Sequence, residues 1–332
     1  MQVNPTVSIV IPAYQTADLI PETLVSVSKQ TLTDYEVLII DDGSTDFLER
    51  AVAPFLTDVR FSLYRFANRG PSGARNQGIA RARGRCIAFL DGDDLMEPTY
   101  LEEMVAALDR TPGSVVSCCD ATLFGVPDRE GRRLSEFEPM DVEPNLANVL
   151  ERRFLVYGGA TMYADAVRAV GNLSQEMWAA EDFDLWVRLL LNGGRIAFVP
   201  KALARYRRRA GSLSNTPTRL HMGRAQAYLR ALGSLNANSV EAAICRRKIG
   251  EALGLMEFHE GERALVGGDI EVARARLRES DRQGVLTPKW RVLRLVLSVF
   301  PGLAARIARK RQESLAPLAR LSAGAMQSTG AE

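Results

Sequence analysis

Cys86-Ile-Ala-Phe-Leu-Asp91-Gly-Asp93-Asp94 is a short apolar run followed by three carboxylates within four positions. The apolar part is typical of a buried strand, which places the acidic residues at its carboxyl end. Like charges this close repel one another, and partial burial raises the cost, so a neighbouring cation stabilises them. Carboxylates with room for water and phosphate oxygens suit Mg²⁺ or Mn²⁺. For this segment alone, a solvated acidic turn is the alternative interpretation.

A second strand ends in the same way. Glu36-Val-Leu-Ile-Ile-Asp41-Asp42-Gly43-Ser44-Thr45-Asp46 is apolar and β-branched before it becomes acidic. An earlier strand, Val7–Pro12, is followed by Tyr14 and a helical stretch at Asp18–Gln30. Strands that alternate with helices predict an α/β sheet, whose ligands bind outside the carboxyl ends of the strands. Three strand ends that converge there indicate a nucleotide site.

The other elements before residue 200 follow from the same hydrophobic patterns. Further strands are expected at Phe61–Arg65, Cys86–Asp91, Ser114–Cys119 and Arg195–Pro200, and further helices at Gly73–Ala82, Thr99–Asp109 and Glu181–Leu191. Pro127–Pro144 is polar and interrupted by prolines, which predicts a loop.

Composition excludes several classes of protein. The 332 residues are 46% apolar and 25% charged, as in an ordinary globular protein, and the net charge of +2 gives no argument for a nucleic-acid partner. No signal-peptide pattern and no transmembrane run is present, so a cytoplasmic location is expected. The four cysteines lack framework spacing and are predicted to be core thiols: Cys86, Cys118, Cys119 and Cys245. Two histidines argue against zinc chemistry.

Strand patterns vanish beyond about Thr216, so residues 216–332 are expected to form a helical C-terminal region. Ala264–Leu277 resembles the hairpin of tetratricopeptide-like helix pairs. Trp290–Ile307 mixes apolar residues with arginines, and the basic run Arg309-Lys310-Arg311 follows. Two interpretations stay open. A capping helix with a solvated basic face is favoured, and a basic amphipathic helix on the inner face of a membrane is the alternative.

The order of the motifs points to a family. Four motifs, taken in order, resemble the donor domain of family 2 glycosyltransferases. They are V-S-I-V-I-P-A-Y from Val7, L-I-I-D-D-G-S-T-D from Leu38, G-A-R-N-Q-G from Gly73 and F-L-D-G-D-D from Phe89. The segment from Trp178 to Leu189, which contains Glu181-Asp182, is similar to that family's acceptor-side acidic motif. The resemblance implies a GT-A-type α/β sheet with helices on both faces, over residues 1–215. Its donor half would end near residue 120 and its acceptor half would cover 121–215.

The same resemblance implies an activity. Enzymes of this family move a sugar from a nucleotide-diphosphate sugar, here most simply a UDP-sugar, to a hydroxyl group with inversion. The acceptor would be a glycan or a lipid-linked glycan in surface polysaccharide synthesis. Pro12 and Tyr14 would border the nucleobase, and Asp42 would accept a hydrogen bond from its imide N–H. Asp41 and Asp46 are expected to serve the turn and the next helix.

The resemblance also assigns residues to the diphosphate and the acceptor. Arg75, near a helix start, would face a phosphate. Asp93 would be a direct ligand of Mn²⁺ or Mg²⁺, and Asp91 would contact the ribose or a metal-bound water. Asp182 would be the general base.

One segment departs from the family pattern. Tyr206-Arg207-Arg208-Arg209-Ala-Gly-Ser212-Leu-Ser214 has arginines where many relatives have a histidine. Arginine cannot ligate a cation but pairs with phosphate, so Arg207 and Arg209 are candidates to clamp the diphosphate.

Three other functions compete with this interpretation. Phe89-Leu-Asp91-Gly-Asp93 satisfies part of the motif of haloacid-dehalogenase-type phosphatases, although that enzyme class leaves the acids at 41–46 and 181–182 without a role. A metal-dependent nucleotidyltransferase is another alternative, because it too combines a bound nucleotide with carboxylates. A degenerate glycosyltransferase-like module that only binds a partner is disfavoured, because all the expected carboxylates are present.

Overall fold

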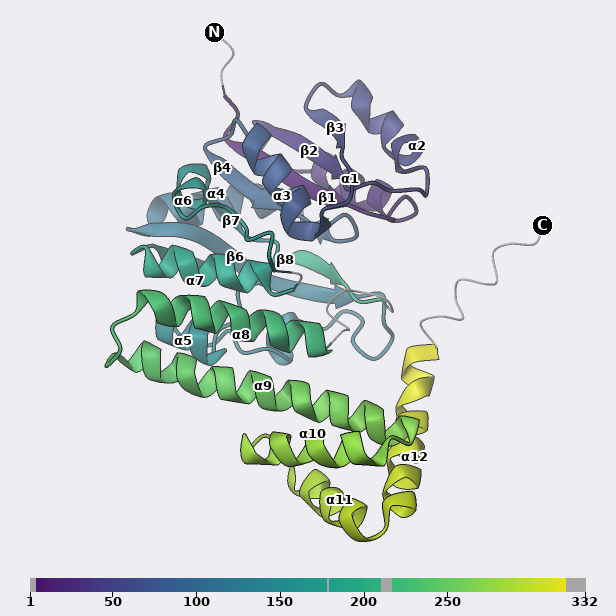
Figure 1. The fold of residues 1–332 in the computed structure, drawn as a ribbon. Coiled ribbons are helices and arrows are strands. Elements are labelled where there is room, and N and C mark those ends of the chain that lie inside the picture. Colours follow the sequence, from purple (N-terminus) through teal and green to yellow (C-terminus); the bar gives the residue numbers. More distant parts are fainter. Residues whose placement is uncertain (1–3, 178, 210–216, 321–332) are drawn as a thin grey trace, which may run out of the picture. The chain divides into compact units, whose positions relative to one another are not determined.

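The computed structural model describes residues 4–177, 179–209 and 217–320, the last ten by their backbone alone. The chain divides into two compact units, Met1–Arg208 and Arg209–Glu332. The first unit contains the sheet, and the second consists of helices (Figure 1).

One mixed sheet organises the first unit. Among the described residues it has eight strands, in the order β3-β2-β1-β4-β7-β6-β8-β5. The strands are β1 (Val7–Ala13), β2 (Tyr35–Asp41), β3 (Phe61–Arg65), β4 (Cys86–Phe89), β5 (Leu95–Met96), β6 (Ser114–Phe124), β7 (Thr161–Tyr163) and β8 (Arg195–Arg207). β3, β2, β1 and β4 are parallel, so their carboxyl ends lie at one edge of the sheet. β7 runs antiparallel to both of its neighbours.

The first unit also contains helices, most of which contact the sheet. They are α1 (Ile20–Ser28), α2 (Leu48–Val52), α3 (Gly70–Arg81), α4 (Tyr100–Arg110), α5 (Leu146–Glu151), α6 (Ala164–Ala169) and α7 (Glu181–Leu191), with 3₁₀ segments η1 (Ala53–Thr57) and η2 (Leu134–Glu136). α3 contacts β1 and β2, and α4 contacts β6, β7 and β8. Every residue of β2 is buried, which explains why its sequence is a continuous apolar run rather than an alternating one.

The structure has a strand at each position where the sequence predicts one, but some bounds differ. The strand expected at Arg195–Pro200 runs on to Arg207, because its second half pairs with both β5 and β6. The strands β5 and β7 were not predicted, since segments of two and three residues carry no periodic pattern. The expected loop Pro127–Pro144 contains only the short segment η2.

The four cysteines are buried and free, as predicted. Burial raises the pKa of the Cys86 thiol to about 11. Because the thiolate is the reactive form, these side chains act as apolar packing.

Helix α3 lies directly on β1 because Gly78 has no side chain. A Cβ at this position would lie 2.3 Å from Val10 Cγ1 and 2.9 Å from Val10 Cγ2. We expect Gly78→Ala to lower the free energy of unfolding by about 1–3 kcal/mol, since the strand and helix must move apart. Gly233→Ala in α8 (Pro217–Ser234) is the control, because a Cβ there would meet no atom within 4 Å. Denaturant unfolding measures both, and equal losses in the two variants would contradict the close-packing argument.

The second unit is helical over its described part. Its helices are α8 (Pro217–Ser234), α9 (Val240–Gly267), α10 (Ile270–Arg282), α11 (Pro288–Val299) and α12 (Pro301–Arg320). α9 is followed by its C-cap Gly268, whose φ of +89° suits glycine. The Asp269 side chain then accepts a hydrogen bond from Val272 N (3.2 Å) at the start of α10. The core between these helices includes Leu265, Leu277, Trp290, Leu297, Ala304, Ala305 and Ala308.

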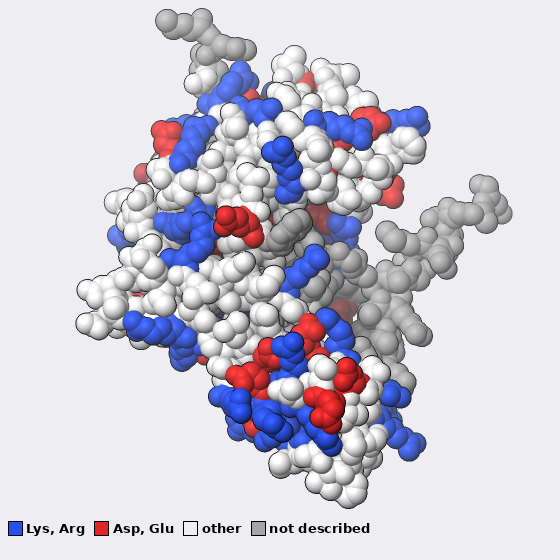
Figure 2. All heavy atoms as spheres, viewed as in Figure 1, with Lys and Arg blue, Asp and Glu red and all other residues white. Residues whose placement is uncertain are grey.

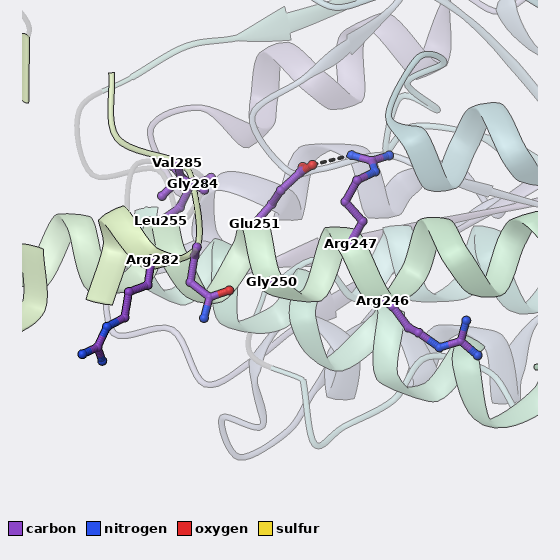
Figure 3. A pocket seen from close by; sticks show the side chains of 9 residues that line it. Arg246, Arg247, Gly250, Glu251, Leu255, Arg282, Gly284 and Val285 are labelled. Carbon is purple, nitrogen blue, oxygen red and sulfur yellow. Dashed lines mark hydrogen bonds and ion pairs between the residues drawn. The ribbon is translucent and has the colours of Figure 1, made fainter. Parts of the chain in front are cut away.

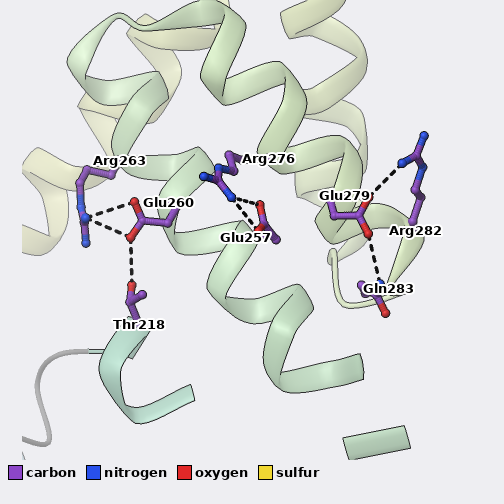
Figure 4. Close-up of polar contacts among 8 residues, drawn as sticks. All are labelled: Thr218, Glu257, Glu260, Arg263, Arg276, Glu279, Arg282 and Gln283. Atoms are coloured by element: carbon purple, nitrogen blue, oxygen red, sulfur yellow. Dashed lines mark hydrogen bonds and ion pairs between the residues drawn. The ribbon is translucent and has the colours of Figure 1, made fainter. Parts of the chain in front are cut away.

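Ion pairs lie over the surface of α9 and α10 (Figure 4). Arg276 pairs with Glu257 across the two helices at 2.8 Å, and Arg263 pairs with Glu260 within α9 at 3.0 Å. Exposed pairs of this kind contribute little, about 0–1 kcal/mol each. Apolar packing is therefore the main stabilising contribution in this unit.

Candidate active site

The carboxyl ends of β1, β2 and β4 form the floor of the candidate site. Asp42 N donates to Ala13 O (2.9 Å), and Leu90 N donates to Val10 O (3.2 Å). The residues that follow these three adjacent strands therefore lie at one edge of the sheet, where α/β proteins bind ligands.

The side chains expected around a nucleobase differ in exposure. Tyr14 is half exposed just after β1, and Pro12 is partly buried within it. Asp42 is buried, and its Oδ1 accepts a hydrogen bond from Arg69 N (2.8 Å). Burial raises the pKa of Asp42 above its ordinary value. A carboxylate that is costly to keep charged gains from a further donor, such as an imide N–H.

Two neighbouring acids hold the loop after β2. Asp41 Oδ1 accepts a hydrogen bond from Ser44 N (2.7 Å), and Asp46 Oδ2 accepts one from Ala17 N (2.8 Å). Asp41 thus serves the turn, as expected. The expectation that Asp46 caps the next helix is wrong: the N-cap of α2 is Phe47, with no side-chain hydrogen bond, and Asp46 instead joins this loop to the loop after β1.

The acidic cluster after β4 divides into held and accessible groups. Asp94 is buried, and it accepts hydrogen bonds from Tyr157 Oη (2.6 Å) and from Arg207 N (2.8 Å). Burial raises the pKa of Asp94, and the charges of Asp91 and Asp93 raise it further. The Asp91 side chain, in contrast, is 47% exposed. This cluster therefore carries an excess of negative charge, and a bound cation would reduce the repulsion between its carboxylates.

These residues fit a divalent metal that binds together with a diphosphate. Within the described ranges, no group of three or more Asp, Glu, His or Cys side chains is arranged to hold a metal alone. Asp91 and Asp93 offer two carboxylates, and Mg²⁺ is commonly held by one or two carboxylates plus substrate phosphates.

Arg75 joins the donor-side carboxylates to helix α7. Its Nη2 donates to Asp91 Oδ1 (2.5 Å) and its Nη1 donates to Glu181 Oε1 (2.7 Å), and the residue is only 7% exposed. Burial lowers the pKa of Arg75, but the charges of Asp91, Glu181 and Asp182 outweigh this effect and raise it overall. The guanidinium is thus already held by two carboxylates, and its contact with a phosphate stays a prediction.

Asp182 lies in the first turn of α7. Its Oδ1 accepts a hydrogen bond from Phe183 N (2.7 Å). Its Oδ2 faces Gly158, where a Cβ would lie 3.4 Å away, and accepts no hydrogen bond from the described part of the chain. The residue before the helix, Ala180, has a φ of +56°, a left-handed conformation that non-glycine residues adopt at a cost. Trp178 lies outside the described residues.

The two acids beside Asp182 are engaged differently. Glu181 is bonded to Arg75, and burial raises its pKa although Arg75 lowers it. Asp184 is 1% exposed and accepts a hydrogen bond from Arg188 Nε (2.8 Å). Asp182 is therefore the acid of this turn that keeps an oxygen for a ligand.

The proposed diphosphate clamp is only partly described. Arg207 donates from Nε to the Asp93 carbonyl oxygen (2.8 Å), pairs with Glu22, and lies 4.2 Å above the ring centroid of Phe124. These contacts hold the acidic loop in place, and a phosphate contact stays a prediction. Arg209 begins the second unit, and residues 210–216, with Ser212 and Ser214, lie outside the described residues.

Sequence reasoning missed Tyr157 and Gly158 as parts of the site. Tyr157 holds Asp94, and Gly158 leaves space beside Asp182 Oδ2. The signal was the pair Gly158-Gly159 after an aromatic residue, which is unusual unless the backbone must approach another group closely.

The second unit has a pocket of its own, of about 690 Å³ (Figure 3). Its lining comes from α9 and from the end of α10 with the turn that follows: Arg246, Arg247, Gly250, Glu251, Leu255, Arg282, Gln283, Gly284 and Val285. Arg247 and Lys248 both pair with Glu251. No residue of the candidate site lines this pocket.

Comparison with known proteins shows what the first unit resembles. Residues 8–170 match the family model described as "Glycosyl transferase family 2", so this segment is similar to the domains of that family. The succinoglycan biosynthesis protein ExoO of Rhizobium meliloti (strain 1021) is 33% identical over 231 residues, which are 63% of this chain and 63% of that protein. The chain thus spans less than two thirds of that relative's length.

Two solved structures show the fold. TarS 1-349 of S. aureus, in complex with UDP-GlcNAc, has a TM-score of 0.61 at 19% identity, over 93% of this chain and 92% of that chain. The mannosyltransferase PcManGT of Pyrobaculum calidifontis, in complex with GDP-Man and Mn²⁺, has a TM-score of 0.58 at 18% identity, over 93% and 88%. The predicted GT-A-type α/β fold with a C-terminal helical region is confirmed.

Proposed function

We propose that this chain transfers a sugar from a nucleotide-diphosphate sugar, most simply a UDP-sugar, to a hydroxyl acceptor with inversion. The observation that carries this proposal is the double contact of Arg75, which joins Asp91 at the donor-side strand end to Glu181 beside Asp182. An acid proposed to bind the donor and the neighbour of the proposed base thus contact one arginine.

The donor would bind along the strand ends. Tyr14 offers an exposed ring to the nucleobase, and Asp42 offers a carboxylate to its imide N–H. Asp91 and Asp93 would hold Mn²⁺ or Mg²⁺ against the diphosphate, and the ion would supply positive charge to the leaving nucleoside diphosphate. Arg207 would keep the acidic loop in position through the Asp93 carbonyl oxygen.

Asp182 would act on the acceptor. Its Oδ2 takes the hydroxyl proton while the acceptor oxygen forms a bond to the anomeric carbon. On the opposite side, the bond from that carbon to the diphosphate oxygen breaks, and the nucleoside diphosphate leaves with the electron pair. One displacement of this kind inverts the anomeric configuration. Glu181 and Asp184 are tied to arginines, which leaves Asp182 for the proton.

The relatives support a polysaccharide role. ExoO is named for succinoglycan biosynthesis, and TarS and PcManGT are solved with sugar nucleotides. We therefore propose a glycan or lipid-linked glycan acceptor. A cytoplasmic location stays a prediction. In the described residues, no helix is long and apolar enough to cross a membrane.

A sugar-nucleotide screen tests the proposed function. The full chain would be incubated with UDP-glucose, UDP-GlcNAc or GDP-mannose and Mn²⁺, and release of nucleoside diphosphate would be measured with and without EDTA. Metal-dependent release from one donor supports the proposal. Phosphate release from a monoester such as p-nitrophenyl phosphate would instead support the phosphatase. Donor binding without release in the presence of acceptor extracts would support the binding module.

A further inference from the structure

Helices α11 and α12 expose a row of large apolar side chains. Val292, Leu295 and Val299 follow one another at helical spacing on one side of α11, and Phe300 at its C-cap, with Leu303 and Ile307 of α12, adds three more exposed apolar side chains. Each of these six residues is exposed. A row of this kind is a surface that favours contact with another apolar phase.

The exposed row does not result from poor packing of the two helices. Trp290 and Leu297 of α11, together with Ala304, Ala305 and Ala308 of α12, are buried in the core of the second unit. The same helices thus carry one apolar side inward and another outward. Core packing, which the capping interpretation predicts, accounts for the first side and leaves the second without a function.

The charge of this segment is of one sign. Residues 288–311 contain seven basic side chains and no Asp or Glu: Lys289, Arg291, Arg294, Arg306, Arg309, Lys310 and Arg311. Arg291 and Arg294 pair with Asp281 of α10. Lys289, Arg306 and Lys310 are exposed. In Figure 2, the region where Figure 1 shows α11 is mostly white, whereas red and blue are interspersed over α9 and α10.

We propose that the outer side of α11 and α12 docks on an anionic lipid surface. The six apolar side chains would enter the boundary between headgroups and acyl chains, and the basic side chains would contact anionic headgroups. A basic segment and an apolar row are two separate contributions, which peripheral binding generally requires.

A second copy of the chain fits this surface less well. A two-fold symmetric contact places the same patch against itself, so the basic residues of one copy would face those of the other. A nucleic acid would neutralise the charge but would leave the apolar row in water. An anionic bilayer satisfies both features.

Vesicle binding of the full chain tests the proposal. Co-sedimentation would be compared for vesicles of phosphatidylcholine alone and of phosphatidylcholine mixed with phosphatidylglycerol. We expect binding to the mixed vesicles, weaker binding to the neutral ones, and a loss of binding as salt is raised. Replacing Arg306 and Lys310 together by Gln should weaken binding by about fivefold for each charge.

A matched pair of variants separates the docking surface from general effects of added charge. Leu295→Glu in α11 and Leu229→Glu in α8 change leucines that are 58% and 55% exposed. We expect Leu295→Glu to lower vesicle affinity about tenfold or more, and Leu229→Glu to leave it nearly unchanged. Thermal unfolding checks that both variants fold.

Several results would overturn the proposal. They are absence of wild-type binding to the mixed vesicles, equal losses in Leu295→Glu and Leu229→Glu, and a dimer in light scattering that Leu295→Glu dissociates without any vesicle binding. Binding to an oligonucleotide in place of vesicles would also overturn it. None of these measurements depends on the proposed glycosyl transfer.

Discussion

Asp182→Asn is expected to lower the rate of nucleoside diphosphate release by about 10²–10⁴-fold, the usual contribution of a general base. Asparagine keeps the size of the side chain, and its Oδ1 can still accept the hydrogen bond from Phe183 N. The nitrogen that replaces Oδ2 cannot take a proton from the acceptor. Steady-state rates, measured with the donor that the wild-type protein accepts, give the result.

Donor binding is the internal check on this prediction. Calorimetric affinity for the donor with Mn²⁺ should stay close to that of the wild type, because Asp182 acts on the acceptor. Glu181→Gln is the control in the same helical turn, since its amide oxygen can still accept from Arg75 Nη1. A wild-type rate in Asp182→Asn would exclude Asp182 as the base. A large loss of rate in Glu181→Gln alone would make Glu181 the candidate base instead.

Asp93→Ala is expected to abolish the metal dependence of nucleoside diphosphate binding. Loss of residues that only orient metal ligands costs about 10–100-fold in metal affinity, so loss of a direct ligand should cost at least as much. Titration of UDP with and without Mn²⁺ measures the difference. The hydrogen bond from Arg207 Nε goes to the backbone carbonyl oxygen of Asp93 and does not need the carboxylate. Thermal unfolding checks that the variant folds.

Asp165→Ala is the control for this experiment. Its side chain is fully exposed on α6 and pairs with Arg168 at 3.4 Å, so its removal should change neither UDP affinity nor the effect of Mn²⁺. If Asp93→Ala keeps the wild-type gain in affinity on adding Mn²⁺, Asp93 is not a metal ligand.

Long, continuous apolar patterns made most of the sheet predictable. The strand at Phe61–Arg65 and the helix at Glu181–Leu191 have the predicted bounds. The short strand Thr161–Tyr163 was not predictable, because it is defined by its pairing with β4 and β6 rather than by its own three residues. The extension of β8 to Arg207 depends on partners in the same way.

The site was predictable as far as motif residues follow strand ends. Asp42 follows β2 directly and Asp91 lies two residues after β4, so topology alone places them at one edge. The contacts of Arg75 with Glu181 and of Arg207 with Asp93 join residues more than 100 positions apart. No local pattern encodes such a contact, so these two contacts could not be predicted from the sequence.

The shared arginine has a thermodynamic consequence. Arg75 divides its charge between Asp91 on the donor side and Glu181 on the acceptor side. A donor that draws Asp91 toward a cation leaves more of this charge to Glu181, and so changes the electrostatic potential at Asp182. Binding free energies are reciprocal. If the donor changes acceptor affinity through Arg75, the acceptor changes donor affinity by that same factor. Under the proposed roles, coupling between donor and acceptor binding would pass through this one buried side chain.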